Sequence, residues 1–223
     1  MPQIELTNVS KVYEIGGEQI RAVDNVSLKI EKGEFLSIVG HSGSGKTTLL
    51  SIIGGAVKPS SGRVLFDGSD ICSLGDTELS RYRNENIGFM FQFASLLPVL
   101  TARENVLLPA LFRQNGKPDI KRADEYLDLV GLADKIHAFP SQLSGGQQRR
   151  VAIVRALMNG SELLLADEPT GDLDEETEAD IMKLFRKINQ EQMITFLFIT
   201  HNLDLAGHAQ RQLRMTHGLI QEL

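Results

Sequence analysis

The residues of this chain with the clearest chemical potential lie at positions 40–47, Gly-His-Ser-Gly-Ser-Gly-Lys-Thr. They match the phosphate-binding pattern Gly-x4-Gly-Lys-Ser/Thr, in which successive backbone N–H groups point at phosphate oxygens. Lys46 can reach the β- and γ-phosphates, and the Thr47 hydroxyl can ligate Mg²⁺. A glycine-rich turn with a chance lysine is the simpler alternative, but such a match arises in fewer than about one in twenty chains of this length. The segment therefore predicts a site for a nucleoside triphosphate.

The elements that flank this segment are the ones the pattern requires. Before it, residues 35–39 form an apolar run short enough to be a buried strand. After it, residues 48–53 have the character of a helix start. A helix N-terminus adds partial positive charge to the loop, which favours bound phosphate.

A second chemical signal is the pair Asp167-Glu168, which follows an apolar Leu-Leu-Leu-Ala run at 163–166. A strand there would deliver both carboxylates at its carboxyl end, where open α/β sheets bind ligands. Asp167 suits Mg²⁺ binding, and Glu168 suits the role of general base toward an attacking water. Alone, an Asp-Glu pair would indicate a solvated turn, but the phosphate loop in the same chain favours the catalytic interpretation.

A third signal is the sequence Leu-Ser-Gly-Gly-Gln that ends at Gln147. Ser144 and Gln147 form a capping-box pattern in front of a helix expected over 148–158. Gly145 and Gly146 leave this helix N-terminus bare, which makes it a second anion-binding end. One chain gives no reason for two phosphate sites, so we expect this end to face the nucleotide of a second copy of the chain.

Composition limits the classes of protein that remain. The 223 residues, 42% of them hydrophobic, allow one large domain or two small ones. The formal net charge of −6 makes the chain a poor general nucleic-acid binder, and we expect no nucleic-acid partner. The single cysteine, Cys72, allows no internal disulfide and fits a reducing compartment. The N-terminus has no signal-peptide pattern, and no apolar run approaches the roughly 20 residues of a membrane helix, so we expect a soluble protein.

The remaining pattern predicts an α/β fold in a single domain, residues 1–223. We expect a mixed sheet flanked by helices, an antiparallel β subdomain, and a helical subdomain inserted at about 92–158, where prolines interrupt helical patterns. Asp67-Gly68 and His217-Gly218 mark hairpin turns, the second within residues 211–223. Further strands are expected at 4–13, 23–30, 63–66, 87–91 and 194–199, and further helices at 121–130, 175–189 and 203–208.

The phosphate loop, the Leu-Ser-Gly-Gly-Gln segment and the Asp167-Glu168 pair occur together with Gln92 and His201, and the combination resembles the ATP-binding subunit of ABC transporters. The resemblance covers essentially the whole chain. It implies a P-loop NTPase core that hydrolyses ATP to ADP and phosphate with Mg²⁺. It also implies a dimer of two copies that ATP brings together, and integral membrane permease subunits as partners.

The resemblance assigns roles to particular residues. Those expected in catalysis are Glu168, His201 and Gln92. Those expected to bind ATP are Tyr13, Gly40, His41, Ser42, Gly43, Ser44, Gly45, Lys46, Thr47 and Thr48. Those expected to bind the ATP of the other copy are Ser144, Gly145, Gly146 and Gln147. Those expected at Mg²⁺ are Thr47, Gln92 and Asp167.

Four of the implied roles have simpler alternatives. Tyr13 would stack on adenine, but it could instead cap a strand edge. Gln92 would sense Mg²⁺ and link to the membrane partner, but it could instead be an ordinary polar residue at a strand end. Asp174, which would lie in a loop that crosses to the other protomer, could be the N-cap of the helix that follows it, and both roles are compatible. His201, which would hold the γ-phosphate, could be a solvated loop histidine, but its place directly after a strand favours the ligand side of the sheet.

The resemblance narrows to a subfamily. Residues 96–106 and 166–171 resemble the lipoprotein-release and macrolide-export ATPases of bacteria, and residues 211–215 are closer to the lipoprotein-release type. In that group the ATPase, on the cytoplasmic face of the inner membrane, drives a periplasmic shape change through two membrane subunits. The sequence departs from the family pattern at His41, Asp172 and His217, where Pro, Asn and Asp are usual, and none of the three has a chemical role.

Large apolar residues that follow Gln92 have no evident core pattern. We expect Phe93, Leu96 and Leu97 to line a groove for a helix of the membrane partner.

Two other function classes share these motifs. ATPases of DNA repair or translation use coiled-coil insertions, zinc modules or two cassettes, whereas this chain has one cassette, one cysteine and no heptads. An ATPase that regulates a cell-division or antibiotic-sensing membrane complex without transport is the other alternative. The intact motifs argue against a module that turns over little ATP.

Overall fold

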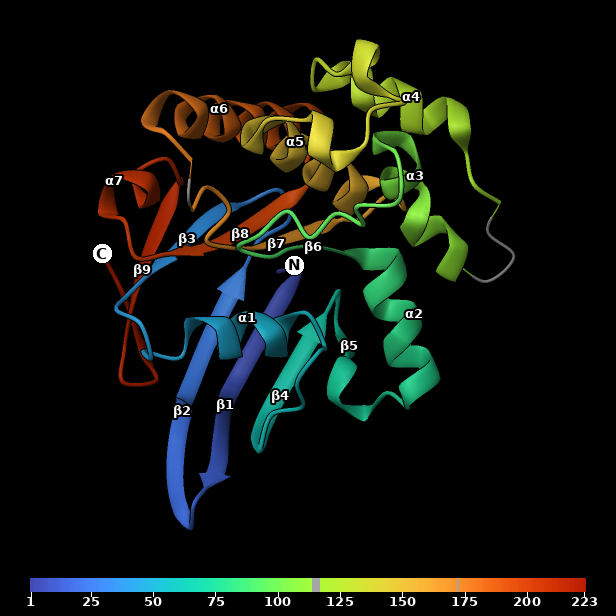
Figure 1. The fold of residues 1–223 in the computed structure, drawn as a ribbon. Coiled ribbons are helices and arrows are strands. Elements are labelled where there is room, and N and C mark those ends of the chain that lie inside the picture. The colour runs from blue at the N-terminus through green and yellow to red at the C-terminus, as the bar shows by residue number, and fades with distance from the viewer. Residues whose placement is uncertain (114–116, 172) are drawn as a thin grey trace.

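The computed structural model describes residues 1–113, 117–171 and 173–223, and its strands form two sheets (Figure 1). In the larger sheet the strand order is β10-β9-β3-β8-β7-β6, and every neighbouring pair is parallel except β9 and β10. Every residue of β3 and β8 is buried, which explains why both are mostly apolar in sequence. The strands are β3 (Phe35–Val39), β6 (Ile87–Met90), β7 (Leu163–Asp167), β8 (Thr195–Thr200), β9 (Arg211–Thr216) and β10 (Leu219–Glu222).

The smaller sheet is antiparallel, with the order β2-β1-β4-β5. Its strands are β1 (Ile4–Ile15), β2 (Glu18–Ile30), β4 (Ser61–Phe66) and β5 (Ser69–Asp70). β1 and β2 pair as far as Ile15 opposite Glu18, so this hairpin is longer than the strands expected from the sequence. Ile15 and Ile20 near its tip are exposed, so the backbone ladder continues where no buried apolar pattern marks it.

Helices cover both faces of the larger sheet. α5 and α6 pack on one face, and α1 lies on the other, between the two sheets (Figure 1). Between β6 and β7 every described element is helical. The α-helices are α1 (Lys46–Ile53), α2 (Asp76–Asn86), α3 (Ala102–Leu107), α4 (Ile120–Leu129), α5 (Gly145–Leu157), α6 (Glu175–Gln192) and α7 (Leu203–Ala206). Short 3₁₀ helices are η1 (Ile71–Ser73), η2 (Leu108–Phe112), η3 (Ala133–Lys135) and η4 (Pro140–Gln142).

The sequence did not predict α2. Most of its residues are polar, and its buried residues are Leu79 and Tyr82. The Tyr82 ring meets Phe66 edge-on at 5.2 Å, and its hydroxyl donates to the carbonyl oxygen of Ile53. Tertiary contacts of a few residues, rather than a long apolar stripe, hold this helix in place.

α5 connects two apolar clusters. Ile153 packs in the cluster on the larger sheet, whereas Val151 and Val154 pack with α3 and α4 in a separate helical cluster. Leu96 is half-buried and packs against both clusters, so it has core contacts that its sequence pattern did not indicate. Within the described residues, no helix has the length and apolar character needed to cross a membrane.

Candidate nucleotide-binding site

The strand order brings most of the expected site residues to the carboxyl ends of the parallel strands in the larger sheet. β3, β8, β7 and β6 are consecutive and parallel, with Val39 opposite Thr200 and Asp167 opposite Ile199. Their carboxyl ends therefore share an edge, and each end leads into a candidate segment. β3 leads into the phosphate loop, β8 into His201, β7 into Glu168 and β6 into the loop of Gln92.

The phosphate loop is closely surrounded by backbone. Gly45 has φ +106°, and a Cβ there would lie 2.0 Å from the carbonyl oxygen of Ala22 on β2, so only glycine fits. On the other side, the Gly218 N–H donates to the carbonyl oxygen of Ser44 at 3.0 Å. Gly218 and His217 both have positive φ, as the predicted hairpin turn requires. The turn between β9 and β10 thus fixes the loop against the smaller sheet.

Lys46 begins α1 with a buried side chain. Its ammonium donates to the carbonyl oxygens of Gly40 and His41 at 2.6 and 3.0 Å, so it lies across the start of its own loop. Burial lowers the pKa of Lys46, and the charges of Glu168 and Asp167 oppose that shift. The Lys46 ammonium is therefore held at the phosphate loop by two carbonyl groups of that loop.

Asp167 and Thr47 form the pair that could hold a metal ion. The Thr47 hydroxyl donates to Asp167 Oδ2 at 2.9 Å, although the two residues are 120 positions apart in the sequence. Burial raises the pKa of Asp167, while the Thr47 hydrogen bond acts in the opposite direction. A hydroxyl and one carboxylate are the protein ligands that Mg²⁺ uses when phosphate oxygens and waters complete its shell.

Glu168 is held on three sides at the end of β7. Its Oε2 accepts from the Thr200 hydroxyl at 3.0 Å, its Oε1 lies 2.8 Å from His201 Nδ1, and its N–H donates to the carbonyl oxygen of Ile199. Its φ of +46° is unusual for a residue with a side chain, and such conformations are concentrated at functional sites. The side chain is 17% exposed, and that of His201 is 74% exposed. Glu168 is thereby accessible from the side where His201 is exposed.

Gln92 contacts the turn after Glu168, whereas Tyr13 contacts other residues of the β1–β2 hairpin. Gln92 is exposed, and a Cβ on Gly171 would meet its Cγ at 3.6 Å, so it borders the turn after Glu168. Tyr13 is half-buried, pairs across the hairpin with Ile20, and has the Lys11 ammonium 5.1 Å from its ring centroid. Ile20 is two residues along β2 from Ala22, whose carbonyl oxygen lies next to Gly45 of the phosphate loop.

The Ser144 end of α5 has neighbours of its own. Ser144 and Gln147 exchange the two hydrogen bonds of the predicted capping box, at 2.9 and 3.2 Å, and α5 begins three residues before the expected start. A Cβ on Gly146 would lie 2.6 Å from Thr177 Cγ2, so this end packs closely against the start of α6. Asp174 caps α6 by accepting from the Thr177 N–H, which confirms the structural alternative for that residue.

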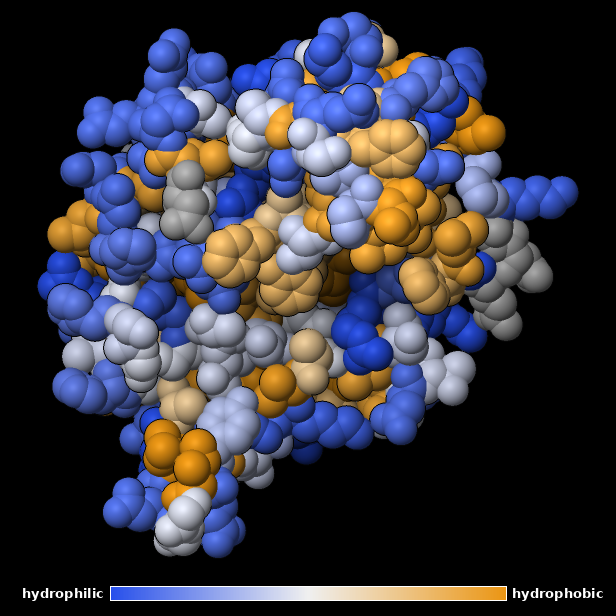
Figure 2. All heavy atoms as spheres, viewed as in Figure 1, coloured by the Kyte–Doolittle hydropathy of each residue, from blue (hydrophilic) through white to orange (hydrophobic). Residues whose placement is uncertain are grey.

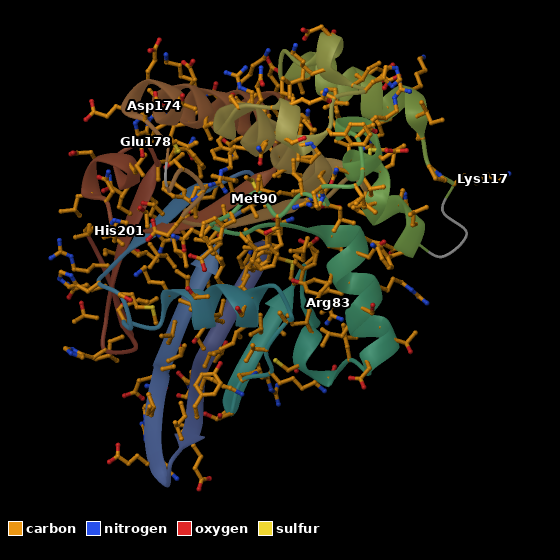
Figure 3. All side chains as sticks on the ribbon, viewed as in Figure 1. Arg83, Met90, Lys117, Asp174, Glu178 and His201 are labelled. Atoms are coloured by element: carbon orange, nitrogen blue, oxygen red, sulfur yellow. The ribbon has the colours of Figure 1, made fainter. Side chains whose placement is uncertain are left out.

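Figure 3 shows Asp174 and Glu178 at the start of α6, on the same side of the molecule as His201. Asp172, noted for its departure from the family pattern, lies outside the described residues.

Comparison with known proteins shows the family of the chain. The family model for ABC transporters matches residues 23–171, more than half of the chain. The chain belongs to this family. It is an ATP-binding subunit of the ABC transporter type, and an ATPase.

Three similar proteins give the family context. The chain is 44% identical over 221 residues to the lipoprotein-releasing system ATP-binding protein LolD 1 of Rhodopseudomonas palustris, with 97% of each chain covered. It is 43% identical to the macrolide export ATP-binding/permease protein MacB of Rhodopirellula baltica, but it spans only 32% of that longer protein. A dimeric post-hydrolysis structure of the ATP-binding cassette MJ0796 of Methanocaldococcus jannaschii, bound to ADP and Pi, superposes with a TM-score of 0.88. That structure is 43% identical, with 99% of this chain and 98% of the other covered.

Sequence reasoning about this ABC ATPase missed two residues that contact the site. Thr200 holds Glu168, and the signal for it was its place at the end of β8, one residue before His201. Arg149 is 4% exposed on α5 and donates to the carbonyl oxygen of Gln92. An arginine two residues after a capping box reads as a solvated helix residue, so no local pattern indicated its burial.

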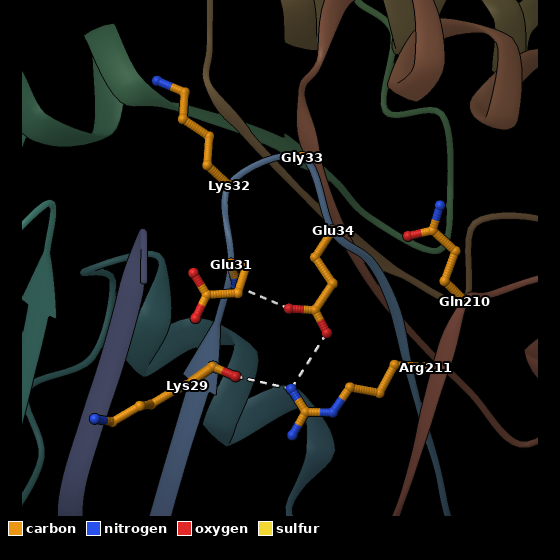
Figure 4. Close-up of a pocket in the computed structure, with 7 residues that line it drawn as sticks. All are labelled: Lys29, Glu31, Lys32, Gly33, Glu34, Gln210 and Arg211. Carbon is orange, nitrogen blue, oxygen red and sulfur yellow. Dashed lines mark hydrogen bonds and ion pairs between the residues drawn. The ribbon is translucent and has the colours of Figure 1, made fainter. Parts of the chain in front are cut away.

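A pocket of about 500 Å³ lies at the amino end of β3, the opposite end of the strand from the phosphate loop of the ABC ATPase (Figure 4). Four of its charged residues, Lys29, Lys32, Glu34 and Arg211, are already paired. Glu34 accepts from Arg211 and from the Glu31 N–H, and Lys29 and Lys32 pair with acidic residues beside the pocket. These ion pairs and hydrogen bonds give the charged side chains a structural role at this end of the sheet.

Proposed function

We propose that this chain is the ATP-hydrolysing subunit of a bacterial ABC transporter, in which two copies bury ATP between them and power a membrane complex of the lipoprotein-release or macrolide-export type. The observation that carries the proposal is the position of Glu168. It lies next to the Asp167–Thr47 pair, at the edge where the phosphate loop ends, and two side chains orient its carboxylate.

The chemistry follows from these positions. The backbone N–H groups of residues 40–48, with the Lys46 ammonium, bind the phosphates. Thr47, Asp167 and Gln92 would hold Mg²⁺, which would supply positive charge next to the phosphates when bound. Glu168 accepts the proton of a water whose oxygen bonds to the γ-phosphorus while the bond to the bridging oxygen breaks. His201 holds both the γ-phosphate and Glu168, and Tyr13 stacks on adenine.

Pairing of two copies completes the site. Ser144, Gly145, Gly146 and Gln147 supply a helix N-terminus to the ATP of the other copy, because a bare helix end favours phosphate. Asp174, at the start of α6, lies beside the seam in the same arrangement. The dimeric MJ0796 structure with ADP and Pi supports this proposal by similarity.

Docking to the membrane subunits uses an apolar surface. Residues of the 91–101 loop and of η2 expose large apolar side chains, and apolar side chains gather over this part of the molecule in Figure 2. The exposed residues there are Phe91, Phe93, Leu97, Val99, Leu111 and Phe112. Apolar exposure of this kind suits a groove for an amphipathic helix. The chain then works as a peripheral subunit on the cytoplasmic face of the inner membrane.

The experiment is to co-express the chain with membrane subunits of the lipoprotein-release type and purify through those subunits. We expect the chain to co-purify at two copies per complex and its ATPase rate to rise in the complex. ATP hydrolysis by the isolated chain with no co-purification or stimulation would restrict the proposal to an ATPase of another membrane or soluble system. A membrane complex that binds the chain but moves no substrate would favour the regulatory alternative.

A further inference from the structure

Arg149 joins three parts of the molecule that the sequence keeps apart. It lies on α5, five residues after Ser144, and is 4% exposed. Its guanidinium donates to the carbonyl oxygens of Phe91, Gln92 and Gly171, at 3.0, 2.5 and 3.2 Å. The first two belong to the loop after β6, and Gly171 belongs to the turn after Glu168. One cation on α5 thus binds both the loop after β6 and the turn after Glu168.

A second arginine of α5, Arg155, also binds the loop after β6. It lies further along α5 and donates to the carbonyl oxygens of Ala94 and Ser95 at 2.9 and 2.8 Å. Burial lowers the pKa of its guanidinium, which nevertheless remains charged because an arginine pKa lies so far above neutrality. Four carbonyl groups of the 91–95 loop therefore accept from two arginines of one helix.

Apart from these bonds, the 91–95 loop has a ring contact between Phe91 and Phe89, packing of Ala94, and a hydrogen bond from the Ser95 hydroxyl to the Phe93 carbonyl oxygen. Gln92, Phe93 and Ser95 are exposed, and Ser95 has a positive φ of +48°. A loop with little buried surface takes its conformation from its hydrogen bonds, and bonds from a charged donor are stronger than neutral ones. Loss of a buried arginine would also leave its carbonyl acceptors unpaired.

We propose that Arg149 is a positioning residue that fixes Gln92 and the Gly171 turn relative to the Ser144 end of α5. This inference rests on the proposed pairing of two copies around ATP. A force on the 91–95 loop then displaces the Ser144 end with it, because the residue that holds the loop belongs to the helix that begins after Ser144. Arg149 acts through the groups it positions and does not itself contact ATP.

The test compares three variants in a Glu168→Gln background, where ATP is not consumed. Arg149→Gln removes the charge and the fork of donors. Arg149→Lys keeps the charge but cannot reach three carbonyl groups at once. The control is Arg150→Gln, since Arg150 is the next residue on α5 and donates to the carbonyl oxygen of Val130, within the helical block. For each protein, the ATP concentration at half-maximal pairing is measured by light scattering, and Tm is recorded.

We expect Arg149→Gln to raise that ATP concentration by about tenfold or more, Arg149→Lys to give an intermediate shift, and Arg150→Gln to leave it unchanged. ATP affinity of the unpaired chain, measured with Ser144→Arg added, should not change with any variant. If Arg149→Gln does not fold, Arg149→Lys decides: a shift with an unchanged Tm supports the role. Equal pairing by folded Arg149 variants and the Glu168→Gln parent would overturn the inference. A parent that does not pair would instead count against the proposed function.

Discussion

At the residue scale, the role of base that we propose for Glu168 depends on the side chains around it. Its two oxygens have different partners, Thr200 on one side and His201 on the other. The first partner is buried and the second is mostly exposed, so the carboxylate is oriented from within and remains open toward solvent. A fixed orientation matters because a general base must lie within hydrogen-bond distance of the proton it accepts.

Thr200→Val should slow the reaction without weakening ATP binding. Valine has nearly the same shape but cannot donate to Glu168 Oε2, and a hydrogen bond to a charged group is worth about 1.5–3 kcal/mol. We expect kcat to fall by about tenfold or more, since tenfold corresponds to about 1.4 kcal/mol, with KM little changed. Thr200→Ser, which keeps the hydroxyl, should restore most of the rate. A full kcat in Thr200→Val would mean that Glu168 is oriented by other groups.

Asp167→Asn should stabilise the nucleotide-free protein at neutral pH. Burial raises the pKa of this carboxyl above its unfolded value, so its ionised form costs stability at high pH. The cost is lost as pH falls through the raised pKa toward the unfolded value near about 3.9. Asparagine keeps an oxygen acceptor for Thr47 and carries no charge, so we expect Tm to rise by about 1–4 °C at pH 7.

Calorimetry at several pH values checks this expectation. The Tm difference between Asp167→Asn and wild type should shrink as the pH approaches the unfolded value. Asp134→Asn, at a carboxylate that is 73% exposed, is the control and should change Tm little at any pH. An Asp167→Asn protein that melts below wild type at neutral pH would contradict the account of this carboxyl.

At the scale of elements, the loop after β6 contains one apolar residue that packs inside the protein and two that we expect to contact the membrane subunits. Leu96 is half-buried against two clusters, whereas Phe93 and Leu97 are 66% and 46% exposed. Phe93→Ala and Leu97→Ala should keep the Tm and basal ATPase rate of the isolated chain but reduce stimulation by the membrane subunits. Leu96→Ala should lower stability by about 1–3 kcal/mol, below the range for a fully buried leucine. Loss of basal ATPase in Phe93→Ala or Leu97→Ala would indicate a folding role for those residues instead.

The same elements indicate which features a sequence can predict. The phosphate loop, the Ser144 capping box and the His217-Gly218 turn depend on local backbone rules, and each occurs where expected. α2 depends on Tyr82 meeting residues of other elements, and its own sequence has no apolar stripe. Buried polar contacts such as those of Arg149 and Thr200 join distant segments, so periodicity within one segment cannot reveal them.

At the scale of the whole molecule, we propose that the phosphate loop and the Ser144 end of α5 act together only when a second copy is bound. The Ser144 end packs on the start of α6 in its own chain, and its helix N-terminus is the group that we propose for the other copy's γ-phosphate. The proposed arrangement is two-fold, so each contact forms twice and two ATP molecules are buried. Each chain carries a formal charge of −6, so pairing also works against net repulsion and depends on the bridging nucleotide.

The most direct measurement is the mass of the Glu168→Gln protein in solution, by gel filtration with light scattering. The amide keeps the shape of the carboxylate but cannot take a proton from water, so ATP should bind and persist. We expect a dimer with ATP, a monomer with ADP or no nucleotide, and a monomer with ATP once Ser144→Arg is added. A Glu168→Gln protein that stays monomeric at saturating ATP would contradict the account, as would a Ser144→Arg double variant that still forms dimers.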